Sequence, residues 1–164
     1  MGTSTIDGTL EAVWLKRRRA KLAIYDKLEF RLADGSTRTI GKSVVAAPVA
    51  ERLVPGTSGR FYLYTSIDHK GLHGIRDDQG GAVFGFATAN ETVMLVVVLV
   101  NAVWLALSVA LRDAVPILAL ALTVLGVPGF FLYRKTRLEA RAQFEADSGY
   151  APPAAAARQP VPGT

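Results

Sequence analysis

The chain of 164 residues contains no cysteine, and only two of its residues are histidine. The absence of cysteine excludes disulfide bonds, thiolate metal sites and a cysteine nucleophile. The first 30 residues contain no apolar run typical of a secretory signal, and Ile6 stands where a myristoylation motif requires Ser or Thr. We therefore expect neither a cleaved export signal nor an N-terminal lipid anchor.

Charge is scarce over two long stretches. Residues 93–111 contain Asn101 and Ser108 as their only strongly polar members, and residues 114–133 are uncharged. A helix rises 1.5 Å per residue, so each stretch can cross a hydrocarbon core of about 30 Å. Neither stretch has the polar face of a helix on a soluble domain. We predict a transmembrane hairpin within residues 89–134, with a hairpin buried in a soluble core as the alternative.

The connection between the two stretches is Arg112 and Asp113. Asp113 is a candidate cap for the second helix, and Pro116 falls in its predicted first turn, where a missing N–H costs little. Basic residues flank the outer ends of the hairpin: Lys70, Arg76, Arg134, Lys135, Arg137 and Arg141. The positive-inside rule then places both termini in the cytoplasm. The excess of Arg over Lys, 13 to 6, together with abundant Ala indicates a bacterial source and hence the inner membrane.

Two polar residues and several small ones are candidates for packing within the hairpin. Asn101 and Thr123 lie at nearly the same depth, which predicts an interhelical hydrogen bond between them. The small residues that favour close approach are Ala102, Ala106, Ala110, Ala119 and Gly126. A polar transport site at Asn101 is the alternative, but neither stretch contains an ionisable residue. Pro128 predicts a kink in the second helix.

Residues 1–88 have the period-two alternation of strands. Apolar residues occupy the even positions of 22–32, interrupted only by Asp26, and the turn 33–36 leads to another strand. Gly8 is a candidate bulge in a strand over 5–15. The remaining predicted elements are a connection at 16–20, a helical turn at 48–53 and strands at 61–67, 72–76 and 82–86. We predict an α+β membrane protein with a small antiparallel β-barrel, SH3-like or OB-like, before the hairpin.

This layout resembles a family of bacterial membrane proteins of unknown function with a small β-domain beside transmembrane helices. The resemblance is carried by Gly8-Thr9-Leu10, by the strand and turn from Phe30 to Gly35, and by Leu53-Val54-Pro55-Gly56 leading into Phe61-Tyr62-Leu63-Tyr64. It implies the same architecture and supplies no catalytic residues.

The strongest charge cluster consists of Lys16, Arg17, Arg18, Arg19 and Lys21. On a domain held beside a cytoplasmic leaflet, such a cluster favours contact with anionic lipid headgroups. A solvated turn without a partner is the alternative. Nucleic-acid binding is disfavoured, because the cluster lacks interleaved aromatic residues.

The one group resembling a chemical site is Asp68, His69 and His73. Positions four apart in a strand share a face, so the two histidines are weak candidates for a metal site. Gly71 and Gly74 instead suggest a turn-rich segment with ordinary surface histidines. No phosphate loop, nucleophile elbow or dinucleotide fingerprint is present, and we expect neither a cofactor nor catalysis.

Residues 135–147 predict a cytoplasmic helix and residues 148–164 a disordered tail rich in Ala and Pro. The sequence thus favours a non-enzymatic inner-membrane protein whose cytoplasmic domain binds a protein partner or senses the membrane surface. An accessory or oligomer-forming subunit of a transport or channel complex is the alternative.

Overall fold

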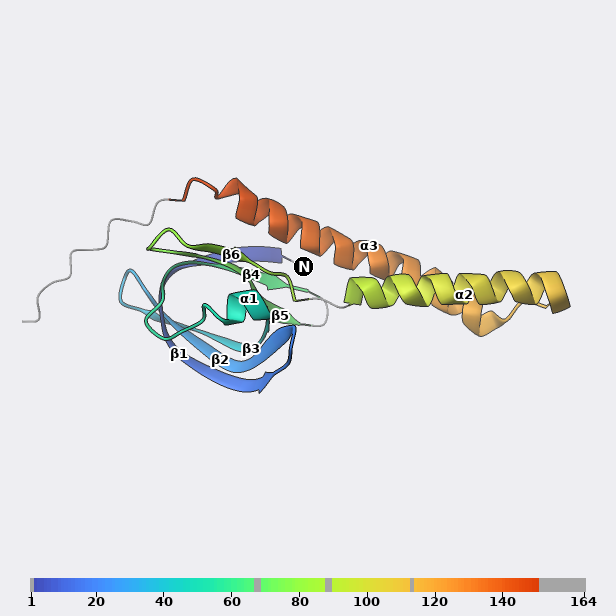
Figure 1. The fold of residues 1–164 in the computed structure, drawn as a ribbon, viewed down its shortest axis with the longest axis horizontal. Coiled ribbons are helices and arrows are strands. Elements are labelled where there is room, and N and C mark those ends of the chain that lie inside the picture. Colours follow the sequence, from blue (N-terminus) through green and yellow to red (C-terminus); the bar gives the residue numbers. More distant parts are fainter. Residues whose placement is uncertain (1, 67–68, 88–89, 113, 151–164) are drawn as a thin grey trace, which may run out of the picture. The chain divides into compact units, whose positions relative to one another are not determined.

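The computed structural model describes residues 2–66, 69–87, 90–112 and 114–150. The chain forms two compact units (Figure 1). The first, here the barrel unit, comprises Met1–Ala87 and Ala140–Thr164, and the second, here the helical unit, comprises Thr88–Glu139.

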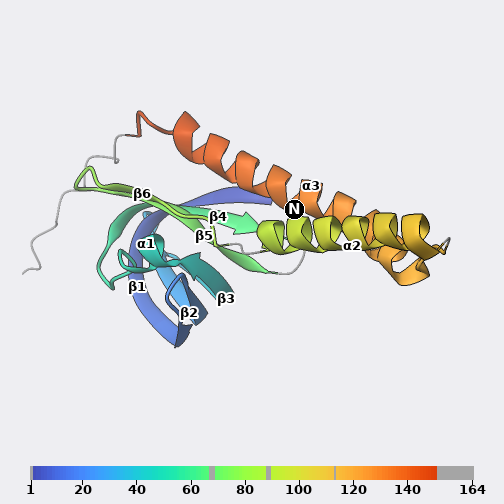
Figure 2. The same ribbon diagram turned by 45° about the vertical axis from the view of Figure 1, so that its right-hand side comes forward.

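Six strands and a short helix make up the N-terminal part of the barrel unit. They are β1 (Gly2–Arg18), β2 (Leu22–Leu32), β3 (Thr37–Ala46), α1 (Ala47–Ala50), β4 (Ser58–Thr65), β5 (Lys70–Asp77) and β6 (Ala82–Phe84). The strand order is β3-β2-β1-β4-β5-β6, and an additional pairing of β3 with β5 closes five strands into a barrel (Figures 1 and 2). The predicted small barrel is therefore present, with β6 added outside the closed ring.

The closing seam corrects the prediction of a purely antiparallel barrel. β3 and β5 pair in parallel through Ser43, Val44 and Val45, whereas the other strand pairs are antiparallel. Parallel neighbours need a long crossover rather than a tight turn, and α1 with β4 supplies it here. The pairings therefore close the ring in the order β1-β2-β3-β5-β4.

β1 is longer than predicted and joins both halves of the barrel. Its first half pairs with β4 and its second with β2, and Gly8 takes part in both pairings. A Cβ atom on Gly8 would lie 2.2 Å from the Arg31 carbonyl oxygen, so glycine permits this close approach. The bulge predicted at Gly8 is wrong, because the register shifts between Leu10 and Ala12 instead. The strand also continues to Arg18, through the predicted connection.

The core inside the barrel contains residues from every part of the sheet, among them Leu10, Leu28, Phe30, Phe61 and Leu72. The predicted even-position pattern of β2 holds for Leu28 and Phe30 but fails for Tyr25, which is buried. The pairing with β1 passes over Asp26, which is therefore the extra residue of a bulge. A bulge shifts a strand by one position, so inward and outward faces exchange there.

The helical unit contains α2 (Asn90–Arg112) and most of α3 (Ile117–Ala146). Asp113, the predicted cap, lies outside the described residues. Pro116 precedes α3 rather than lying in its first turn, and its carbonyl accepts a hydrogen bond from the Leu120 N–H at 3.1 Å. The separate helix predicted for 135–147 is the continuation of α3, which runs through Pro128 and includes Ala140–Ala146 of the barrel unit.

The predicted hydrogen bond between Asn101 and Thr123 is not made. Asn101 Nδ2 donates to the Val97 carbonyl and Thr123 Oγ1 to the Ala119 carbonyl, each at 2.8 Å within its own helix. Each of these side chains hydrogen-bonds to a backbone carbonyl one turn earlier in its own helix. Neither therefore needs a partner on the other helix. Asn101 is nevertheless buried, at 8% exposure.

The two helices contact each other through a face that only partly matches the predicted small residues. Ala119 and Gly126 are buried and Ala102 is half-buried, but Ala106 and Ala110 are exposed. A Cβ atom on Gly126 would lie 2.7 Å from Val98 Cγ2, so this glycine allows α2 and α3 to approach closely. The face of α2 that contacts α3 contains Asn101 and Ser108, which are seven residues apart. It does not run along the alanines spaced by four.

Both helices are long and apolar enough to cross a membrane, over Asn90–Leu111 and within Ile117–Ala146. Only 11% of the apolar window of each is buried. Large exposed side chains line both helices, including Leu99, Val103, Trp104, Leu118 and Leu125. A helix from a soluble core would be mostly buried, so this exposure disfavours the soluble alternative.

Candidate functional site

A second cluster of aromatic residues lies on the outer face of β4, β5 and β6. Phe61 and Leu63 point into the barrel core, and the alternating residues Tyr62 and Tyr64 are buried on the opposite face. His73 is fully buried among these outer rings. Its ring centroid lies 5.9 Å from those of Tyr62 and Phe84, 6.1 Å from that of Tyr64 and 6.4 Å from that of Phe86.

A bulge in β5 positions His73. Leu63 pairs with Leu72 and Tyr62 with Gly74, so His73 is an extra residue between two paired ones. Leu72 and Ile75 both enter the core although they are three positions apart, which a regular strand does not allow. The bulge thus brings His73 and Gly74 to the outer face together.

The burial of His73 makes its protonation costly. Within the described residues, neither Nδ1 nor Nε2 of His73 has a hydrogen-bond partner, and most groups around the ring are aromatic. Burial lowers the pKa of His73 to about 4, and the backbone of Ala140 opposes this only in part. The imidazole is therefore neutral near pH 7 and packs as an aromatic ring.

The C-terminal part of the barrel unit covers this aromatic face. We call Ala140–Tyr150 the strap: it comprises the end of α3, which Figures 1 and 2 show above β4 and β6, and the turn that follows. Phe144 lies over Gly74, where a Cβ atom would be only 2.6 Å from its ring. Its ring centroid is 5.1 Å from that of Tyr62 and 5.4 Å from that of Phe84. Glycine at position 74 therefore leaves the space that the Phe144 ring occupies.

Arg76 closes the end of α3. Its Nη2 donates to the Phe144 carbonyl at 2.9 Å, and its guanidinium lies 4.4 Å from the centre of the Phe144 ring. The last carbonyls of a helix lack partners within the helix and carry partial negative charge. Arg76 therefore satisfies a helix end and holds the strap to β5.

A second polar contact lies just beyond the helix. Asp147 Oδ2 accepts hydrogen bonds from Arg60 Nη1 and from the Tyr62 hydroxyl, both at 2.9 Å. Arg60 also binds Asp7 through Nε at 2.6 Å and Nη2 at 2.8 Å, and it lies 4.5 Å from the Tyr150 ring centre. Arg60 and Tyr62 hold the pKa of Asp147 below its usual range. Burial raises the pKa of Tyr62 to about 12, and its hydrogen bond to Asp147 contributes to this rise.

These contacts include residues that the sequence assigned to a disordered C-terminal tail. Ser148–Tyr150, placed in the tail by the sequence, form a turn and an ordered end in which Tyr150 stacks on Arg60. Residues 151–164 lie outside the described residues.

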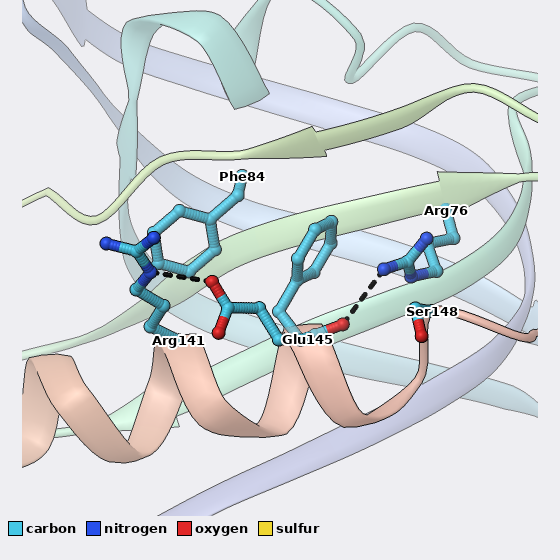
Figure 3. A pocket seen from close by; sticks show the side chains of 6 residues that line it. Arg76, Phe84, Arg141, Glu145 and Ser148 are labelled. Carbon is cyan, nitrogen blue, oxygen red and sulfur yellow. Dashed lines mark hydrogen bonds and ion pairs between the residues drawn. The ribbon is translucent and has the colours of Figure 1, made fainter.

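An open hollow of about 550 Å³ lies between the strap and the sheet, lined by Arg76, Phe84, Arg141, Phe144, Glu145 and Ser148 (Figure 3). Arg141 Nε and Glu145 Oε1 form an ion pair at 2.7 Å, and Arg76 is held by the Phe144 carbonyl. Arg141 and Glu145 therefore neutralise each other, whereas Arg76 is bound to a backbone carbonyl.

The metal candidates are only partly brought together. His69 and His73 both lie beside Tyr64, with ring centroids at 5.5 Å and 6.1 Å from its own. Asp68 lies outside the described residues. Among the residues that are described, no group of three or more His, Cys, Asp or Glu side chains is placed to hold a metal ion. The segment is also not a turn, because Gly71 and Gly74 belong to β5.

The basic cluster lies at the far end of the β1–β2 hairpin, and its residues are all exposed. Lys16 pairs with Asp26 at 3.0 Å and Arg18 with Glu51 at 3.7 Å. The sequence reasoning missed Trp14 and Leu15, which are 44% and 52% exposed immediately before the cluster. A tryptophan two positions before a basic run was the available signal.

The pKa of His73 predicts a pH dependence of barrel stability. Its folded pKa of about 4 lies below the model-peptide value of 6.5, so the unfolded chain binds a proton more tightly between these values. We expect the free energy of unfolding to be highest above pH 6.5 and to fall by roughly 3 kcal/mol by pH 4. Urea unfolding of the full chain in detergent at several pH values measures this.

Replacing His73 with Leu should remove most of that pH dependence. The lowered pKa of Asp147 also makes stability depend on pH, but only at pH values near and below its usual 3.8. The effect of Asp147 can therefore be separated from that of His73, which acts at higher pH. An equal loss of stability between pH 6.5 and 4 in wild type and His73→Leu would contradict the assignment.

Comparison with protein-family models, with curated proteins and with solved structures yields no match to this chain.

Proposed function

We propose that the protein is a non-enzymatic, membrane-anchored protein of the bacterial inner membrane that presents its barrel unit at the cytoplasmic surface. The barrel unit would bind a protein partner or sense the membrane surface there. The observation that carries this proposal is the apolar surface of α2 and α3, which is exposed around most of both helices. In water such a surface would cause aggregation, whereas a bilayer is its natural solvent.

The short connection to α2 supports a place at the membrane surface. Only residues 88–89 separate Ala87, the last described residue of the barrel unit's N-terminal part, from Asn90 at the start of α2. Three peptide steps reach about 10 Å when extended. A membrane span by α2 would therefore begin within three residues of the barrel unit along the chain.

The polar groups on the outer face of the barrel unit are engaged in structural contacts. In the described parts of the chain, the buried histidine is neutral and packed among rings, and the hollow beneath the strap contains the Arg141–Glu145 ion pair and Arg76 bound to a backbone carbonyl. The polar groups are used for holding the strap to the barrel. This arrangement fits a domain that binds through its surface.

A specific observation also favours the second function, that of an oligomer-forming or accessory subunit. Ala106 and Ala110 are exposed on α2, on a face that α3 does not cover. Small residues spaced by four allow another helix to approach closely within a bilayer. Disulfide cross-linking of Ala106→Cys between two copies in membranes would support this function, and exclusively monomeric protein would oppose it.

The lack of cysteine allows a direct test of the proposed topology. Gln79→Cys places a thiol on the exposed turn between β5 and β6, and Ala114→Cys places one between α2 and α3. In intact cells, we expect a membrane-impermeant maleimide to label only the protein with Ala114→Cys. After permeabilisation, both should react, which provides the control for accessibility. Labelling of Gln79→Cys alone in intact cells, or release of the protein from membranes by alkaline carbonate, would overturn the proposal.

A further inference from the structure

The end of the β1–β2 hairpin combines two kinds of exposed side chain. We call residues 14–21 the hairpin tip. It contains Trp14 and Leu15, and five basic residues follow them: Lys16, Arg17, Arg18, Arg19 and Lys21. All eight residues of the tip are exposed.

The tip extends beyond the barrel core. The pairing of β1 with β2 shifts register on both sides of Leu15, between Trp14 and Leu15 and again before Arg17. Adjacent residues of a regular strand point to opposite faces, so one of Trp14 and Leu15 would normally be covered by the barrel. Here Val13 is half-buried against the core, whereas Trp14 and Leu15 are both exposed. The two apolar side chains therefore both remain partly uncovered, at 44% and 52% exposure, next to the basic ones.

The positive charge of the tip is only partly neutralised. Lys16 and Arg18 have the acidic partners Asp26 and Glu51. No ion pair with a described residue is made by Arg17, Arg19 or Lys21. Lys27, which forms an ion pair with Glu29, lies 4.7 Å from the centre of the Trp14 ring. An exposed tryptophan in a tip with an excess of positive charge suits a surface that is apolar below and anionic above.

We propose that the hairpin tip docks on the anionic lipids of the leaflet beside the barrel unit, with Trp14 and Leu15 entering the headgroup region and the basic residues contacting lipid phosphates. Charge complementarity selects this occupant, because cytoplasmic leaflets are negatively charged. Tryptophan is enriched at the membrane interface, where its ring is partly apolar and its N–H remains hydrated. This inference rests on the proposed membrane anchoring and adds the surface of the barrel unit that meets the lipid.

The experiment uses Trp14 as its own probe. The only other tryptophan is Trp104, in α2, so Trp104→Phe leaves one reporter in the full chain. This protein is reconstituted into vesicles of phosphatidylcholine alone, or of equal parts phosphatidylcholine and phosphatidylglycerol, each with brominated acyl chains. We expect strong quenching and a blue shift of Trp14 emission only with phosphatidylglycerol, and recovery of the emission at high salt.

Matched variants test the role of the charges. Arg17→Gln with Arg19→Gln removes two unpaired cations from the tip and should weaken docking about fivefold for each residue. Arg38→Gln with Arg52→Gln removes two exposed cations elsewhere on the barrel unit and should leave the quenching unchanged. Equal quenching in both double variants would overturn the proposal.

The outcomes separate this inference from the anchoring on which it rests. Failure to float with either vesicle would overturn the anchoring itself. Flotation with both vesicles, with Trp14 unquenched in both, would overturn only the docking of the tip. A Trp14 response to single-stranded RNA in detergent, without a response to phosphatidylglycerol, would assign the tip to nucleic acid and also overturn the proposal.

Discussion

Replacing Gly71 with Ala should unfold the barrel or prevent its assembly. A Cβ atom at this position would lie 1.8 Å from the carbonyl oxygen of Val44 and 2.8 Å from a Tyr64 ring carbon. Val44 belongs to β3 and pairs with Gly71 across the parallel seam that closes the barrel. Because the clash is with backbone, a change of rotamer cannot relieve it, and the seam must open.

The expected loss is more than about 4 kcal/mol, which is a large part of the roughly 5–15 kcal/mol that stabilises a small domain. Urea unfolding of the full chain in detergent, followed by tyrosine fluorescence and circular dichroism, measures this loss. Gly41→Ala is the matched control, because it makes the same change in β3 where the nearest atom to an added Cβ lies 3.9 Å away. Equal stability of the two variants would show that the β3–β5 seam does not hold the barrel closed.

Replacing Phe144 with Ala should release the strap from the barrel. Phe144 is 9% exposed and fills the space above Gly74 between the rings of Tyr62 and Phe84. Loss of a buried phenylalanine side chain costs about 3–5 kcal/mol. Arg76 would also lose the ring on which it lies, which weakens its contact with the end of α3.

Release of the strap has a spectroscopic signature. Once His73 is hydrated, the cause of its depressed pKa is removed, so its pKa should rise from about 4 towards 6.5. Nuclear magnetic resonance titration of the imidazole protons measures this shift. Glu145→Gln, one residue away and exposed, removes only the surface ion pair with Arg141 and should leave the pKa of His73 unchanged. An unaltered pKa in Phe144→Ala would mean that the strap does not keep water from His73.

Local sequence patterns were sufficient to predict much of this architecture. The two uncharged stretches predict α2 and α3, because length and composition alone decide whether a helix can cross a bilayer. The turn at 33–36, the alternation of residues 22–32 and the further predicted strands predict a small barrel, because side chains alternate along any strand. The basic cluster was also visible in the sequence, since its charges are consecutive.

Bulges explain where the local patterns failed. Asp26 interrupts the alternation of β2 and marks the position at which its faces exchange, so Tyr25 is buried instead of exposed. The extra residue in β5 is His73, and its neighbours Gly71 and Gly74 resemble turn formers in sequence. Both glycines are instead required by atoms that approach from elsewhere, the Val44 carbonyl and the Phe144 ring.

The sequence by itself thus determined which segments are apolar helices, which are strands and where charge accumulates, because these depend on residues close together in the chain. Only the tertiary structure decided that β3 pairs in parallel with β5, that His73 is buried, and that Arg60 and Tyr62 bind Asp147 more than 80 residues away. Those outcomes depend on register and on contacts between distant segments, for which the local pattern contains no signal.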